Sequence, residues 1–217
     1  MKTGTELNMR RRLPQYLLGL IIMALGIVLI KKSALGMSPI SALPAAVTEL
    51  TALSLGTTTA AWHIVCMLLQ LAVTRRVTLR LALLLPLAVV FGWLIDLFML
   101  ALAFTPASLP LRWALCFVGI VFTALGIVFI NGADLMLPAP DALLRAVSQR
   151  TGAPFSRVKI AGDVLWVVLT AALELGCGGA IVSVGAGTLA CMVLTGLFSG
   201  QIKKLLPQLE MPPVGKG

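Results

Sequence analysis

The sequence predicts an all-α polytopic membrane protein: six transmembrane helices and two proline-broken segments, arranged as two inverted repeats of three spans each. Three observations predict this fold class. Apolar residues make up 59% of the 217-residue chain and charged residues only 12%, whereas a soluble domain carries about 25% charged residues. Several stretches reach the ~20 apolar residues that a bilayer crossing needs. One segment of the chain also recurs further along it.

The recurring segment is residues 12–51, which align without a gap with residues 112–151 and are identical at fourteen of the forty positions. Gly19 and Gly26 recur as Gly119 and Gly126, seven residues apart on one helical face. Because small residues at this spacing let helices approach closely, we expect the first helices of the two repeats to pack together. Duplication of this kind is typical of transporters that are built around a central site.

Six apolar stretches are predicted to cross the bilayer, at about residues 13–31, 57–74, 80–104, 112–130, 158–176 and 180–199. Two further stretches, 33–54 and 133–155, each follow the first span of a repeat and are broken by prolines. Interrupted segments at matching places of two repeats indicate a transport site, since irregular backbone at membrane depth is tolerated only within protein or beside a water-filled cavity. The alternative is a pair of amphipathic helices on the membrane surface, and the sequence leaves both interpretations open.

The distribution of Lys and Arg predicts the orientation of the spans. With six spans and a cytoplasmic N-terminus, fourteen of these residues lie inside and three outside, which is the bias expected for cytoplasmic loops. The predicted organisation is a cytoplasmic tail (1–12), a first repeat (13–104), a second repeat (112–199) and a second cytoplasmic tail (200–217). Three spans are an odd number, so the second repeat enters the membrane from the opposite side.

Several functional classes find no support in the sequence. The formal net charge is +9, but Lys and Arg stand at the ends of apolar runs and no aromatic–basic patch appears, so nucleic acid is not an expected partner. The four cysteines form no CxxC pair that would indicate metal or redox chemistry. No metalloprotease, nucleophile-elbow or P-loop motif is present. We therefore expect no enzymatic activity, no cofactor and no metal.

The starts of the two broken segments supply the first candidate site residues. Ser38 before Pro39 is a typical helix start, and Asp141 follows Pro140 in the second half. Ser41 and Asp141 share a repeat position. The N-terminus of a half-helix carries partial positive charge and free N–H groups that suit an anion. Ser38 and Ser41 fit ligand binding or capping equally well, whereas Asp141 favours capping or a salt bridge to Arg145.

Ionisable residues inside the spans supply the other candidates. His63 and Asp163 share a repeat position, and Asp96 lies in the following span. Such groups usually face the bundle interior or a water-filled path. We expect His63 and Asp96 to share a level beneath Ser38, although a lone histidine is also compatible with a plain core role. Asp163 stands one helical turn from Lys159 and is expected to pair with it.

Three stretches resemble a known family. The run Leu35-Gly36-Met37-Ser38-Pro39-Ile40-Ser41-Ala42-Leu43 resembles a signature of the YczE/YitT-like bacterial membrane proteins, as do Phe91-Gly92-Trp93-Leu94-Ile95-Asp96-Leu97 and Pro140-Asp141-Ala142-Leu143. The likeness extends over roughly residues 12 to 199. This sequence has Ser41 where the family usually has Asp. The resemblance implies a multi-spanning protein of the bacterial cytoplasmic (inner) membrane, without a particular substrate.

These observations predict a small inverted-repeat secondary transporter or permease, with a site formed by Ser38, Ser41, His63, Asp96, Asp141 and Asp163. The expected partners are the lipid bilayer and a small-molecule or ion substrate, and a homo-oligomer is compatible with the sequence. The alternative function is a non-transporting scaffold or regulatory subunit of another membrane complex.

Overall fold

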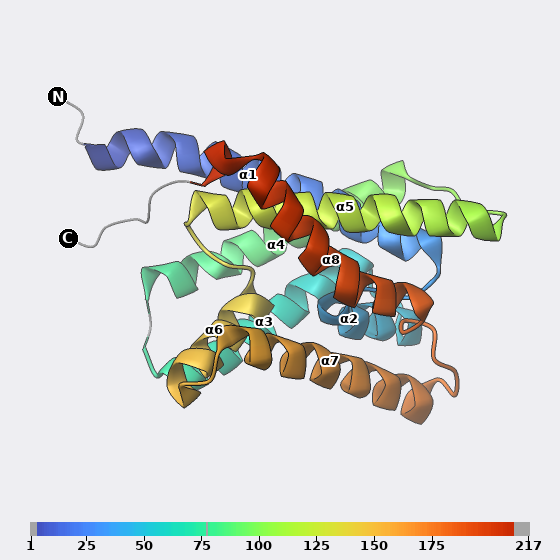
Figure 1. The fold of residues 1–217 in the computed structure, drawn as a ribbon. Helices are drawn as coiled ribbons and strands as arrows, with labels where there is room; N and C mark the ends of the chain where they lie inside the picture. The colour runs from blue at the N-terminus through green and yellow to red at the C-terminus, as the bar shows by residue number, and fades with distance from the viewer. Residues whose placement is uncertain (1–3, 77, 211–217) are drawn as a thin grey trace.

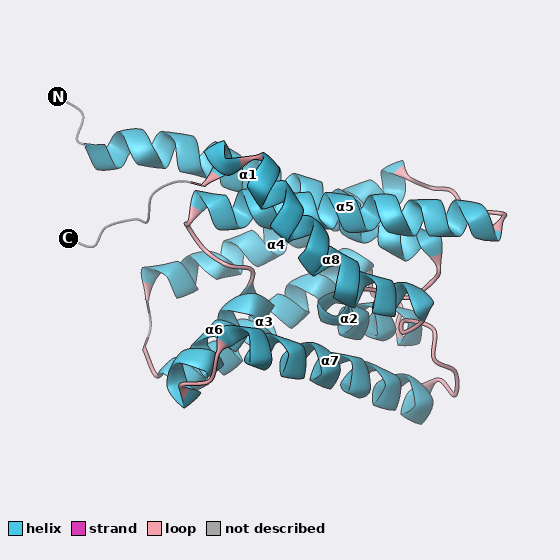
Figure 2. Ribbon diagram, viewed as in Figure 1, coloured by secondary structure: helices cyan, strands magenta, loops and turns pink. Residues whose placement is uncertain are grey.

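The computed structural model describes residues 4–76 and 78–210, and all regular structure in this part of the chain is helical. The elements are α1 (Gly4–Ser33), α2 (Pro39–Leu50), α3 (Leu55–Thr74), α4 (Leu79–Ala101), α5 (Leu109–Ala133), α6 (Ala139–Thr151), α7 (Phe155–Cys177), α8 (Ala186–Leu205) and the 3₁₀ turn η1 (Pro207–Leu209). Figure 2 shows these helices joined by loops.

The six long helices run between two ends of a bundle (Figure 1). We call the end at which α1 begins and α8 ends the proximal end, and the opposite end the distal end. The short helix α6 lies towards the proximal end, and the short helix α2 lies nearer the distal end. The two predicted broken segments are therefore short helices in opposite halves of the bundle.

Five of the helices in the described part of the chain are long and apolar enough to cross a membrane: α1, α3, α4, α5 and α7. The protein is thus a helical integral membrane protein. The sixth predicted span, 180–199, corresponds to α8, which is not among the five. This helix begins at Ala186 and runs on to Leu205, so it leaves out Ile181 and Val182 and takes in Lys203 and Lys204.

The ends of the chain depart from the predicted tails. α1 begins at Gly4, so most of the predicted tail 1–12 is helical. At the other end α8 extends past residue 199 and η1 follows it. The predicted tail segments 1–3 and 211–217 lie outside the described residues.

Glycines bring α1 and α5 together, as the repeated spacing predicts. A Cβ atom on Gly26 would lie 2.6 Å from the backbone nitrogen of Thr123, and one on Gly126 would lie 2.8 Å from the carbonyl of Gly19. Gly26 meets Thr123, whereas Gly19 meets Gly126, so residue numbers increase along α1 in the direction in which they decrease along α5. The two helices are therefore antiparallel. Backbones this close admit no side chain at the crossing. The predicted packing between the two first helices is confirmed.

Each short helix packs against a long helix of the other half of the chain: α2 against α7, and α6 against α3. Each also packs against the long helix that follows it in sequence. Prolines start both short helices, Pro39 as the first residue of α2 and Pro140 as the second of α6. Proline suits these positions because the first helical turn needs no donor there.

Local geometry repeats at a spacing of one hundred residues. Ala34 and Asp134, just after α1 and α5, both adopt the left-handed conformation, with φ of 51° and 49°. The hydroxyls of Thr51 and Thr151 donate to the carbonyls of Val47 and Val147, at 2.7 and 2.9 Å. The chain therefore leaves α1 and α5 in the same way, whereas α2 ends in extended backbone at Thr51 and α6 ends at the left-handed Gly152.

The packing between the second and third long helices differs in the two halves. α3 and α4 pack along their lengths, whereas α7 and α8 make almost no contact. Gly56 and Gly92 permit the first contact, since a Cβ on Gly56 would lie 2.0 Å from the carbonyl of Gly92. The glycines of α7 and α8 make no such contact between these two helices. The bundle is consequently more open between α7 and α8.

Extended backbone is enclosed near the start of α8. The amide of Met37 donates to the carbonyl of Ser183 at 2.8 Å, and the amide of Gly187 donates to the carbonyl of Leu35 at 2.7 Å. The buried carboxylate of Glu174 accepts from the amide of Ser183 at 2.9 Å. These bonds satisfy backbone groups that lipid would leave unpaired.

Candidate functional site

A cavity of about 900 Å³ lies inside the bundle between the two short helices and the six long helices. Its lining includes Ser38 and Ser41 at the start of α2 and runs out to Thr74, Gln149 and Lys203 in the last turns of α3, α6 and α8. Those three turns lie at the proximal end. The cavity therefore extends from the interior of the bundle towards the proximal end.

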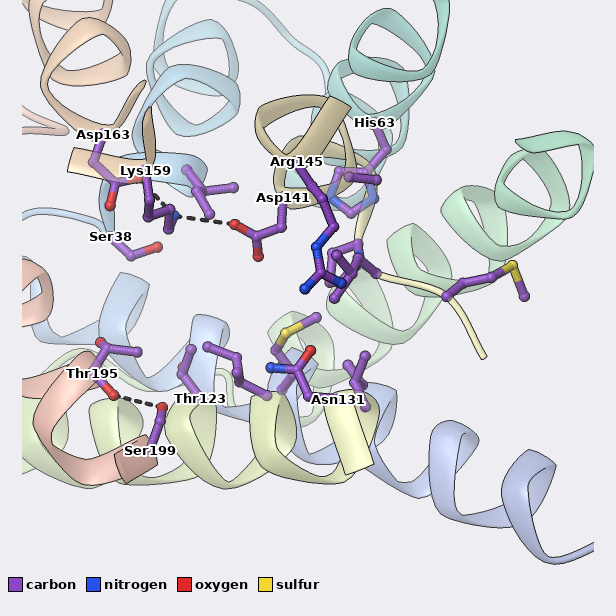
Figure 3. Close-up of a pocket in the computed structure, with 18 of the residues that line it drawn as sticks. Ser38, His63, Thr123, Asn131, Asp141, Arg145, Lys159, Asp163, Thr195 and Ser199 are labelled. Carbon is purple, nitrogen blue, oxygen red and sulfur yellow. Dashed lines mark hydrogen bonds and ion pairs between the residues drawn. The ribbon is translucent and has the colours of Figure 1, made fainter. Parts of the chain in front are cut away.

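Three charged residues of the second half form an ionic cluster in this cavity (Figure 3). The Nζ atom of Lys159 lies 2.7 Å from Oδ1 of Asp163 and 3.2 Å from Oδ1 of Asp141. All three side chains are mostly buried. The predicted pair of Lys159 and Asp163 is confirmed, and Asp141 joins it from α6.

The predicted salt bridge between Asp141 and Arg145 is wrong. Both residues lie on α6, but α6 packs against α7, and this places Lys159 beside Asp141. Arg145 is exposed, and its guanidinium carbon lies 5.7 Å above the ring of Phe155. Arg145 remains on the cavity wall opposite Asn131 of α5 (Figure 3).

The start of α2 lacks such a charged cluster. Ser38 is the N-cap residue, as predicted, but its side chain makes no capping hydrogen bond. No acidic residue stands in the first turn of α2, whereas Asp141 stands in the first turn of α6. Ser41 is buried on the cavity wall.

His63 contributes to the cavity from α3. Its side chain is 8% exposed and stacks on Phe91 of α4, with ring centroids 5.5 Å apart. Thr59 and Trp62, also on α3, line the same cavity. The Thr59 hydroxyl and the Trp62 indole nitrogen are buried and have no hydrogen-bond partner within the described residues.

Asp96 does not lie in the cavity with the other five predicted residues. Its carboxylate accepts from the hydroxyl of Ser54 at 2.6 Å and from the amide of Gly56 at 2.7 Å. Both donors belong to the start of α3. The structure thus gives Asp96 a capping position at the N-terminus of α3, where the helix dipole favours a negative charge, and His63 lies two turns further along the helix.

The structure adds polar residues that sequence reasoning did not select as site residues. Those shown in Figure 3 are Thr123, Asn131, Arg145, Lys159, Thr195 and Ser199. Thr59 is a further polar residue of the cavity, and the sequence contained a signal for it, because Thr59 occupies the same repeat position as Lys159. No group of three or more His, Cys, Asp or Glu side chains suited to a metal occurs in residues 4–76 and 78–210.

Comparison with known proteins bears on the family but not on the activity. A family model described as a family of unknown function, DUF6198, matches residues 10–204. The chain belongs to this family. The match is consistent with the expected uncharacterised family, although no comparison names YczE/YitT-like proteins. No curated protein and no solved structure matches the chain.

Proposed function

We propose that this protein is a small inverted-repeat secondary transporter or permease, and that the cavity is its solute site. In this account the proximal end faces the cytoplasm, the membrane is the bacterial cytoplasmic membrane, and the chain performs no enzymatic reaction. A small molecule or ion is the expected substrate.

One observation carries the proposal: α2 and α6 both begin at the walls of the same interior cavity, through Ser38 and Asp141. The two helices occupy opposite halves of the bundle (Figure 1). Half-helices that enter from opposite sides and meet at a site near the middle are the arrangement on which many transporters rest. A structural scaffold needs no polar cavity of this kind.

The repeated geometry supports an inverted duplication. α1 and α5 cross in antiparallel directions, and each short helix packs against a long helix of the other half. The helix ends at Ala34 and Asp134 have the same backbone conformation. These relations are those of two similar units that face opposite sides of a membrane.

The cavity is open towards one end of the bundle and closed towards the other. This difference supports one of the two conformations of an alternating-access transporter. Polar groups line the cavity out to Gln149 and Lys203 at the proximal end. Beyond the start of α2, hydrogen bonds between the segments around Met37 and Ser183 hold the backbone together. Alternating access requires one side to open as the other closes. A cavity that extends towards the proximal end, which faces the cytoplasm in this proposal, corresponds to an inward-facing state.

Flux through proteoliposomes tests the proposal. Purified protein is reconstituted, and efflux is measured for a panel of organic acids, amino acids, amines and sugars. We expect at least one solute to leave faster than from empty liposomes, and Asp163→Asn to reduce this flux at least tenfold, about 1.4 kcal/mol in barrier height. Glu49→Gln is the matched control, because it also removes a carboxylate paired with a lysine, Lys31, but lies outside the cavity.

The outcome also separates the transporter from the scaffold. No flux above empty liposomes for the whole panel, together with stable co-purification of one fixed partner, contradicts transport and favours the regulatory subunit. Equal loss of flux in Asp163→Asn and Glu49→Gln removes the cavity from the mechanism.

A further inference from the structure

Three repeat positions on the cavity wall carry different chemistry in the two halves. In the second half they are Asp141, Lys159 and Asp163, an ionic cluster in which one lysine lies between two carboxylates. In the first half the same positions are Ser41, Thr59 and His63, which line the same cavity. The first half therefore presents polar groups without a charge of their own.

The two half-helix ends differ in the same sense. Asp141 places a carboxylate in the first turn of α6, where it offsets the positive end of the helix dipole. The first turn of α2 holds no acidic residue, and Ser38 makes no capping bond from its side chain. An anion bound there would offset the positive end of the α2 dipole, as the Asp141 carboxylate does for α6.

Buried hydroxyls without partners indicate that a polar ligand completes the site. Thr59 is 3% exposed and Thr123 is 6% exposed, both line the cavity, and neither hydroxyl has a hydrogen-bond partner within the described residues. A buried hydroxyl left unpaired costs about 1–3 kcal/mol on mutational scales. The Thr123 hydroxyl lies at the crossing of α5 with α1, where a Cβ on Gly26 would be 2.5 Å from it. Thr59 is therefore the unpartnered hydroxyl on which the inference depends.

The positive charge that remains near the start of α2 belongs to the helix end and not to a side chain. Lys159 and Arg145 balance Asp141 and Asp163, and Lys203 balances Glu210, with which it pairs. Asp134 follows Ala133, whose carbonyl accepts from the buried guanidinium of Arg12, so a basic group stands close to it. The first turn of α2 holds no acidic residue, so about half a positive charge at this helix end is not offset by a side chain of the same turn. An anionic group bound there would offset it.

Part of the cavity wall is apolar. Met23 and Ile27 of α1 and Phe91 of α4 line the cavity, and its volume of about 900 Å³ exceeds what an inorganic ion fills. Sites for organic ligands combine apolar walls with a few placed polar groups.

We propose that the first turn of α2 binds the anionic group of a small organic acid. Ser38, Ser41 and Thr59 donate to this group, and the rest of the ligand lies against Met23, Ile27 and Phe91. This inference rests on the proposed function, because it names the substrate class of the same cavity.

Ligand-induced stabilisation tests the inference. The purified full chain in a neutral maltoside detergent is titrated at constant ionic strength with sodium acetate, butyrate, octanoate and benzoate. Butyramide, benzamide, butylammonium and chloride serve as comparisons of matched shape or charge. We expect at least one carboxylate to raise the melting temperature with saturation, and the amides, the amine and chloride to leave it unchanged.

Ser41→Asp is the decisive variant, because it gives the first half the carboxylate that the second half already has. We expect Ser41→Asp to weaken carboxylate binding at least about tenfold, equivalent to 1.4 kcal/mol. Ser41→Asn introduces an uncharged side chain of the same size as Asp, and we expect it to keep the affinity within about threefold of the wild type. Thr59→Val removes one donor and keeps the shape of the side chain. It is expected to weaken binding several-fold and serves as the test if Ser41→Asp does not fold.

Three results would overturn the inference: equal stabilisation by amide and carboxylate, the same shift from chloride alone, or stabilisation by none of the four carboxylates. Carboxylate binding that persists unchanged in both Ser41→Asp and Thr59→Val would also overturn it. Failure of the proposed function is distinguishable. Carboxylate binding without flux in liposomes removes transport and keeps the site, whereas flux of another solute without carboxylate binding removes only the ligand class.

Discussion

At the scale of single residues, position in the repeat does not fix role. Asp141 and Asp163 stand where the first half has Ser41 and His63. Lys159 forms ion pairs with both aspartates, whereas Ser41 and His63 are neutral polar residues on the same cavity wall. The two halves therefore differ chemically in side chains that the shared packing leaves free to diverge.

Asp96 should matter for stability and not for solute binding. Asp96→Asn weakens two charge-assisted hydrogen bonds at the start of α3, to Ser54 and Gly56, and such bonds contribute about 1.5–3 kcal/mol each. We expect a lower melting temperature in detergent with unchanged ligand affinity. A variant that melts like the wild type but no longer binds solute would return Asp96 to the site.

Asp96 shows which features of the site the sequence could predict and which it could not. Its ionisable side chain within an apolar span was visible, but its partners lie forty residues earlier, and their position depends on how α3 packs against α4. Likewise Arg145 is the sequence neighbour of Asp141, yet α6–α7 packing brings Lys159 to it instead. Spacing along one helix cannot supply partners that tertiary packing chooses.

At the scale of elements, glycine contacts explain which helices lie close together. Gly92→Ala would place a Cβ atom 2.5 Å from the carbonyl of Gly56 and force α3 from α4. Overpacking of this kind costs about 1–3 kcal/mol. We expect a clear loss of thermal stability, measured by unfolding in detergent.

Gly176→Ala is the control for this prediction. Gly176 lies in α7, and an added Cβ there meets nothing within 4 Å. Alanine should leave stability unchanged or raise it by about 0.5–1 kcal/mol. If both alanine variants behave alike, the close approach of α3 and α4 does not limit stability.

The segment before α8 depends on Glu174 in a comparable way. Its carboxylate accepts from the amides of Val182 and Ser183, so Glu174→Gln replaces a charged acceptor by a weaker one. We expect faster amide hydrogen exchange at these two positions and little change in α1 and α5. Unchanged exchange at Val182 and Ser183 would show that other contacts hold this segment.

The sequence predicted these elements better than it predicted their sites. The repeated Gly19, Gly26, Gly119 and Gly126 identified the packing of α1 and α5 because small residues act through backbone approach alone. Prolines likewise marked the starts of α2 and α6. The ends of α1 and α8 were missed, since polar residues extend both helices beyond their apolar cores.

At the scale of the whole molecule, access to the cavity should be confined to the proximal side. Ser199 lies on α8 and lines the cavity. In a Cys177→Ser background, which removes the exposed native thiol, Ser199→Cys should react with an impermeant maleimide only from the cytoplasmic side. Protection of this cysteine by the bound solute would support a shared site, and labelling from outside in the resting protein would contradict an inward-facing state.

The central claim, two units of opposite orientation with one half-helix each, is tested most directly by the sidedness of the turns after α2 and α6. Leu53, 51% exposed, follows α2, and the exposed Arg150 stands in the last turn of α6. Leu53→Cys and Arg150→Cys are each made in the Cys177→Ser background and treated with an impermeant maleimide in intact cells. We expect Leu53→Cys to react from outside and Arg150→Cys to react only after permeabilisation. Reaction of both from the same side would contradict the inverted arrangement.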